Sequence, residues 1–124
     1  MTADPIDRYN AWVERYKKAW ASNEPGDISS LFSEDAGYLD EPYKQPWIGR
    51  ESIVKEWLER KDTPGDWTFE YEVLAANDRV GFVRGTTRYK TSGKTYLNLW
   101  EVYLDTEGNA RRFVEWYCEV PPAG

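Results

Sequence analysis

Residues 80–104, VGFVRGTTRYKTSGKTYLNLWEVYL, decide the fold because they have the pattern of a β-hairpin. β-Branched and aromatic residues run along both halves of this stretch, and the turn signal Thr91-Ser92-Gly93-Lys94 separates them. Such runs favour extended backbone, and a connection this short joins antiparallel neighbours. The stretch therefore predicts strands over residues 80–90 and 95–104.

Two further runs of the same kind flank the hairpin. Residues 68–75 precede it across Asn77-Asp78, and residues 111–120 follow it across the connection 105–109. Both connections are short enough for hairpins. The four runs together predict an antiparallel meander.

The residues before the meander have helical periodicity instead. Apolar side chains recur at spacings of three and four along 7–22, from Asp27 to Phe32, and along 50–61, which predicts three helices. An extended segment, 37–40, and a loop with two prolines, 41–47, lie between the second and third helices. This order predicts an α+β fold with the helices against one face of the sheet, as one domain over residues 1–124 with its core at about 6–120.

Composition excludes several chemistries. The 124 residues include no histidine and one cysteine, so a Ser-His-Asp or Cys-His couple, a zinc-finger ligand set and an internal disulfide are all impossible. A metal would have to be a hard cation held by carboxylates. We expect no cofactor and no metal site.

Charge and hydropathy bear on partners and location. Asp plus Glu number 22 against 16 Lys plus Arg, a net charge of -6, which does not suit nucleic acid or an anionic membrane. The N-terminus, MTADPIDRYN, lacks the pattern of a signal peptide, and no apolar run is long enough to span a membrane. With its lone cysteine, the sequence predicts a cytoplasmic protein. The aromatic residues, 16% of the chain, must line either a core or a cavity.

Short motifs along the whole chain carry a resemblance to a known family. They are Arg15-Tyr16, Gly26-Asp27, the run 31–36, Asp40 with Pro46 and Gly49, the strand pair 80–104 and the turn at Gly108. In their order and spacing the chain resembles the ketosteroid isomerase and SnoaL-like branch of the nuclear transport factor 2-like superfamily. The resemblance implies a cone-shaped α+β barrel, in which N-terminal helices pack on a curved antiparallel sheet that encloses an apolar pocket, and it implies a homodimer.

The resemblance also implies roles for individual residues. Isomerases of this type remove a proton next to a ketone with a carboxylate and hold the enolate oxygen with two hydrogen-bond donors. Asp40 falls on the position of the general base and Tyr16 on that of the phenolic donor. The second donor, a protonated aspartic acid in the family, falls on Trp100, which offers one neutral N–H. Alternatively, Asp40 caps a turn, Tyr16 is a core aromatic and Trp100 fills volume.

Strand alternation predicts which other residues share the interior with Trp100. Together with Trp57 of the third predicted helix, the predicted substrate-binding set is Asn98, Thr87, Tyr89, Phe113, Glu115 and Tyr117. Glu115 is costly inside an aromatic pocket, so it should be a second acid or base, a ligand contact, or bonded to Tyr or Trp donors. A register shifted by one residue would instead turn Glu115 to solvent.

The opposite face of the sheet is too apolar to be left in water. It carries Leu97, Leu99, Tyr103, Val114 and Trp116. An exposed face of this kind is usually an interface, which predicts a homodimer through the sheet.

The sequence leaves three functions open. The first is a small enzyme that does acid/base chemistry on an apolar carbonyl compound, by isomerisation, cyclisation, hydration or dehydration, with Asp40 as the base and Tyr16 as the oxyanion donor. The second is a non-catalytic domain whose aromatic cage binds an apolar ligand. The third is an interaction domain whose aromatic residues only fill a collapsed core.

Overall fold

The computed structural model describes residues 4–122, and both ends of the predicted 1–124 domain lie outside the described residues. Three helices and six strands follow one another along the chain. Their bounds are α1 Pro5–Ser22, α2 Pro25–Ser29, β1 Phe32–Leu39, β2 Trp47–Ile48, α3 Arg50–Glu59, β3 Trp67–Ala76, β4 Gly81–Tyr89, β5 Thr95–Leu104 and β6 Ala110–Glu119.

Helix α1 forms where the apolar periodicity predicts it. The Asp4 carboxylate caps its start by accepting a hydrogen bond from the Ile6 N–H at 2.9 Å, and Pro5 suits the first turn. The helix ends at Asn23, which adopts a left-handed conformation with φ 52°. Its buried stripe, Tyr9, Trp12, Val13, Tyr16 and Ala19, packs against the sheet.

The second predicted helix is too long. Helix α2 ends at Ser29, and Phe32 opens strand β1, where it pairs with Ala110. The Leu31 carbonyl accepts a hydrogen bond from the Ala110 N–H at 2.7 Å. A helix of five residues gains little from its own hydrogen bonds, so pairing with β6 decides the conformation of this segment. The predicted extended segment 37–40 is therefore only the end of a longer strand.

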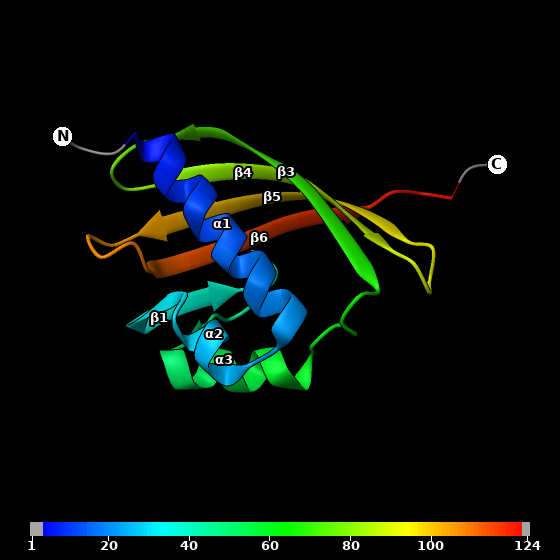
Figure 1. Cartoon of the computed structure of the whole chain (residues 1–124), viewed down its shortest axis with the longest axis horizontal. Coiled ribbons are helices and arrows are strands. Elements are labelled where there is room, and N and C mark those ends of the chain that lie inside the picture. The colour runs from blue at the N-terminus through cyan, green and yellow to red at the C-terminus, as the bar shows by residue number, and fades with distance from the viewer. Residues whose placement is uncertain (1–3, 123–124) are drawn as a thin grey trace.

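The sheet has the strand order β2-β1-β6-β5-β4-β3. Strands β3 to β6 form the predicted antiparallel meander, but β1 runs parallel to β6, so the sheet is mixed rather than wholly antiparallel. Register shifts between Val73 and Ala75 and between Tyr103 and Leu104 interrupt the ladders. Such bulges bend strands and increase their twist. Figure 1 shows the result, an open sheet that curves around α1, with α2 and α3 beside β1. The predicted α+β cone is confirmed.

The outer face of the sheet is apolar over part of its area. Leu97, Leu99 and Trp116 are exposed on it, with exposed fractions of 49%, 39% and 48%. Val114, predicted to share this exposed face, is buried, because β1 joins the sheet next to β6 and Leu39 pairs with it. Tyr103 is half-buried. The predicted dimer interface remains a prediction.

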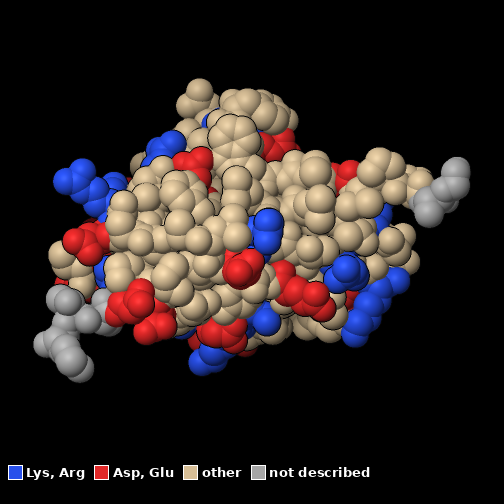
Figure 2. All heavy atoms as spheres, turned by 90° about the horizontal axis from the view of Figure 1, so that it is seen from above, with Lys and Arg blue, Asp and Glu red and all other residues tan. Residues whose placement is uncertain are grey.

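Charged side chains of both signs are interspersed over the surface. On the face seen in Figure 2, acidic and basic residues alternate around broad uncharged areas. Within residues 4–122, no helix has the length and apolarity that crossing a membrane requires.

Candidate active site

A cavity of about 520 Å³ opens at the end of the cone where α1, α3, β1 and the β4–β6 part of the sheet converge. The interior is therefore not collapsed, as the third alternative assumed. The wall of the cavity includes most of the predicted site residues: Tyr16, Asp40, Trp57, Thr87, Tyr89, Asn98, Trp100, Glu115 and Tyr117.

Phe113 is the predicted residue that does not reach the cavity. Its side chain faces inward, as the alternation predicts, but it is fully buried behind the wall. Tyr38 stacks on it with 4.6 Å between ring centroids, and Tyr16 stacks at 5.6 Å. Phe113 lies further toward the start of β6 than Glu115, where α1 covers the sheet. Phe113 therefore does not line the cavity as predicted, because the alternation along a strand shows which face a residue lies on but not how deep in the cone it lies.

Glu115 occupies a prepared position in the wall. Register pairs it with Trp100 on β5, so the alternative that Glu115 faces bulk solvent is wrong. Its Oε2 accepts hydrogen bonds from Asn98 Nδ2 at 2.7 Å and from Trp100 Nε1 at 3.0 Å. Asn98 Oδ1 in turn accepts a hydrogen bond from the Thr87 hydroxyl at 2.8 Å. The two donors orient Oε2 and leave Oε1 for a ligand, and the Thr87 hydroxyl holds the Asn98 amide in place.

The surroundings of Glu115 bring its titration close to neutrality. Burial raises the pKa of its carboxyl to about 7, and the negative charges of Asp40 and Asp62 add to this rise. The hydrogen bonds from Trp100 and Asn98 act in the opposite direction, because they stabilise the charged form. Glu115 can therefore give or take a proton near pH 7.

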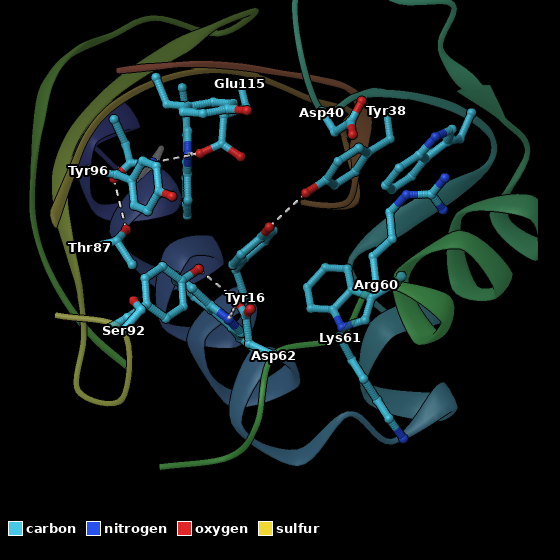
Figure 3. A pocket seen from close by; sticks show the side chains of 17 residues that line it. Tyr16, Tyr38, Asp40, Arg60, Lys61, Asp62, Thr87, Ser92, Tyr96 and Glu115 are labelled. Carbon is cyan, nitrogen blue, oxygen red and sulfur yellow. Dashed lines mark hydrogen bonds between the residues drawn. The ribbon is translucent and has the colours of Figure 1, made fainter. Parts of the chain in front are cut away.

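Two phenols face this carboxyl. The hydroxyls of Tyr16 and Tyr38 lie 2.8 Å apart, and both rings are buried (Figure 3). Burial, followed by repulsion from neighbouring negative groups that include Glu115, raises the pKa of both phenols well above the ordinary value. Both are neutral at pH 7, so whichever phenol accepts the mutual hydrogen bond keeps its own proton for a ligand.

Tyr38 was absent from the predicted site. The sequence did contain a signal for it, since Tyr38 precedes Asp40 by two residues in an extended segment and so shares its face.

Asp40 follows directly on strand β1. Its Oδ1 is buried and has no hydrogen-bond partner among the described residues, while Oδ2 lies 3.7 Å from Lys44 Nζ. The parallel register pairs Leu39 with Val114, so Asp40 and Glu115 follow at the same level of two neighbouring strands. Neighbouring strands are roughly 4.8 Å apart, which explains why the charge of Asp40 acts on Glu115.

A third carboxylate, Asp62, was not predicted. It follows α3 at the cavity mouth, and its Oδ2 accepts hydrogen bonds from Trp20 Nε1 at 3.0 Å and from the Tyr89 hydroxyl at 2.9 Å. In the described part of the chain, no three acidic or cysteine side chains come together as a metal site would need.

Aromatic side chains with a polar end make up most of the cavity wall. They are Tyr16, Trp20, Tyr38, Trp47, Trp57, Tyr89, Tyr96, Trp100 and Tyr117. Trp47 stacks on Tyr38 with 4.6 Å between ring centroids and 6° between ring planes. These rings offer apolar faces together with a few N–H and O–H groups, the usual composition of a small-molecule site.

Comparisons with known proteins agree with this architecture. A ketosteroid isomerase-like protein from Erwinia carotovora atroseptica SCRI1043 superposes with a TM-score of 0.67 at 17% identity, over 98% of this chain and 100% of that one. An NTF-2 like protein of unknown function from Burkholderia xenovorans LB400 gives a TM-score of 0.74 at 12% identity, over 97% and 90%. An NTF2-like protein of unknown function from Mesorhizobium loti gives 0.70 at 16% identity, over 95% and 97%. At these identities the likeness concerns the fold alone.

The sequence itself identifies the family. No match was found among curated proteins. The pattern that defines SnoaL-like domains, however, matches residues 13–120, from the middle of α1 to the end of the meander. The chain therefore belongs to the SnoaL-like domain family, and its fold is the one that the ketosteroid isomerase-like and NTF2-like structures share.

Proposed function

We propose that this chain is a small enzyme that does acid/base chemistry on an apolar carbonyl compound, with Asp40 as general base, Tyr16 as oxyanion donor and Glu115 as a second acid or base. One observation carries the proposal. Two carboxyl groups, Asp40 just after β1 and Glu115 on the neighbouring strand β6 with a pKa of about 7, share a single cavity with a pair of neutral buried phenols.

The reaction is a proton transfer at carbon. Asp40 takes a proton from the carbon next to the carbonyl, the C–H electron pair becomes the C=C bond of an enolate, and the carbonyl π pair moves to oxygen. A hydroxyl of the Tyr16–Tyr38 pair donates to that oxygen. Protonated Asp40 then returns its proton to the same or another carbon, or protonated Glu115 gives its own proton there and regains one from Asp40 before the next turnover, so atoms and charge balance. A preorganised donor of this kind is worth a few kcal/mol in a site that excludes water.

The two carboxyl groups suit different parts of this cycle. Asp40 has a buried oxygen without a partner, which is available to a ligand. Glu115 is anchored through one oxygen and titrates near neutrality, so it can serve as acid and as base at pH 7. Adjacent carboxyl groups in different surroundings are a recurrent way of assigning acid and base roles.

Hydrogen–deuterium exchange tests the chemistry without knowledge of the natural substrate. In D2O, loss of the α-proton NMR signals of 1-indanone and 2-tetralone should be faster with the protein than in buffer. We expect Asp40→Asn and Glu115→Gln to slow it by about 100-fold, and Tyr16→Phe by about 10-fold or more. Glu72→Gln, an exposed residue of β3 outside the cavity, and Tyr71→Phe, whose hydroxyl bonds to Glu14 on the surface, should leave the rate unchanged.

A ligand-binding measurement separates this proposal from a non-catalytic binding domain. Phenolates imitate the enolate, so phenols should raise the melting temperature, and more so for Asp40→Asn, which lacks the competing charge. If phenols stabilise both forms equally and no ketone exchanges, the chain is a binding domain and the acid/base proposal is wrong.

A further inference from the structure

The cavity is negatively charged as well as aromatic. Asp40 enters it from the end of β1, Asp62 from the segment after α3 and Glu115 from β6. The only basic side chains among the described residues of its wall are Arg60 and Lys61, both exposed at the mouth.

These two basic side chains do little to cancel the interior charge. Arg60 pairs with Glu56 and Glu59, and its guanidinium lies 5.3 Å from the ring centroid of Trp47. The Lys61 side chain extends away from the carboxyl groups of the cavity in Figure 3.

Neutral groups hold the carboxylate at the mouth in place. The donors to Asp62 are the Trp20 indole and the Tyr89 phenol, both bound to the same oxygen. Hydrogen bonds from neutral donors fix the position of a carboxylate without cancelling its charge. The other oxygen of Asp62 is left for a ligand, and Trp20 and Tyr89, which donate to Oδ2, flank this carboxylate in the wall.

Such surroundings favour one kind of ligand. An organic cation is attracted to the faces of Trp and Tyr rings, and it is attracted again to a carboxylate in partly desolvated surroundings. A neutral ligand of the same shape gains neither attraction, and an anion is repelled.

We infer that the ligand of this cavity carries a positively charged nitrogen, as a protonated amine or a quaternary ammonium, and that this group lies against Asp62, Trp20 and Tyr89 while an apolar body reaches inward. The inference rests on the proposed function and specifies its substrate class. It also removes an electrostatic difficulty, because the enolate forms in the same cavity as the carboxylate of Asp62 and the ionised form of Glu115, which repel it. A cationic group on the same substrate offsets that repulsion.

A pair of probes of equal shape tests the inference. Choline and 3,3-dimethylbutan-1-ol differ in having nitrogen or carbon at the branched centre, and so in charge alone. Titrations followed by the NMR signals of the tryptophan indole N–H groups give both dissociation constants. We expect choline to bind about tenfold more tightly than the neutral alcohol. Equal affinities, or no binding of choline, would overturn the inference.

Variants then locate the cationic group. Asp62→Asn should weaken choline binding about tenfold and leave the binding of the alcohol unchanged. Glu51→Gln, exposed in the first turn of α3, makes the same change in net charge away from the cavity and should have no effect on either probe. Choline binding that survives Asp62→Asn at full strength would contradict the assignment to Asp62, and the wild-type comparison of the two probes stands even if Asp62→Asn fails to fold.

The two proposals can fail separately. Choline binding requires no turnover, and exchange of 1-indanone requires no cation. Exchange without preference for choline would leave the acid/base function standing and overturn the substrate class. Preference for choline without exchange of any ketone would overturn the acid/base function and leave the preference for a cationic ligand standing.

Discussion

Glu115 determines how stability should depend on pH at the scale of a single residue. Its carboxyl has a pKa of about 7 in the folded state, against an ordinary value of 4.5, so the folded protein binds more protons than the unfolded chain between these values. By linkage, the contribution of Glu115 to stability is fully present below pH 4.5 and is lost as pH rises to about 7. The size of this loss is on the order of a few kcal/mol.

Glu115→Gln should remove this pH dependence. A glutamine side chain can still accept the hydrogen bonds from Trp100 and Asn98 but carries no charge to desolvate. At pH 8 the variant should therefore be more stable than the wild type, by about 1–3 kcal/mol, and near pH 4 the two should converge. Urea unfolding across this pH range measures the difference, with Glu72→Gln as a surface control. A constant difference at all pH values would show that Glu115 is not held in this environment.

Residues of the site were predictable from sequence where alternation along a strand decides the direction of a side chain. Glu115, Asn98 and Trp100 face inward because their strands belong to a regular meander. Asp62 was not predictable in this way. It lies in the irregular segment after α3, and neither helical nor strand spacing in the sequence predicts where such a segment passes the opening of the cavity.

At the scale of elements, the meander was predictable because each strand pairs with its neighbour in the chain. The course of β1 was not, because its pairing with β6 joins residues far apart in sequence and overrides the helical spacing of Leu31 and Phe32. The same pairing brings Asp40 level with Glu115. The sequence could therefore predict Asp40 and Glu115 as site residues but not the adjacency that couples them.

The packing of β3 on β4 should tolerate no side chain at Gly85. A Cβ atom there would lie 2.3 Å from Phe69 Cε1 and 3.2 Å from the Glu70 carbonyl oxygen. Phe69 stacks on Trp100 with 4.8 Å between ring centroids, so it cannot move without disturbing the cavity wall. We expect Gly85→Ala to lower the free energy of unfolding by about 1–3 kcal/mol.

Urea unfolding measures this effect, and Gly26→Ala is the matched control. Position 26 has nothing within 4 Å of the added Cβ and lies in α2, so alanine there should be neutral or slightly stabilising. If Gly85→Ala were as stable as Gly26→Ala, the close packing of Phe69 on β4 would be wrong.

At the scale of the whole molecule, the exposed apolar part of the outer sheet face should join two copies of the chain. Leu97, Leu99 and Trp116 occupy neighbouring positions on β5 and β6, since Leu99 pairs with Trp116 and Leu97 with Cys118. Burying a leucine side chain stabilises an association by roughly 1.5–3 kcal/mol, and a monomer that leaves this contiguous apolar surface in water lacks that stabilisation. We therefore expect a homodimer in solution.

Light scattering after size-exclusion chromatography tests this expectation. The wild type at micromolar concentration should have twice the mass of the chain, and the double variant Leu97→Asp, Leu99→Asp should have the mass of one chain, because a dimer would then bury four unpaired carboxylates. Leu74→Asp is the control. Leu74 is likewise exposed but lies on the edge strand β3, which β4 separates from β5, so its variant should stay dimeric. Because the cavity opens on the opposite face of the sheet, the monomeric variant should bind choline as the wild type does, which separates assembly from the site. A wild-type monomer would contradict the interface.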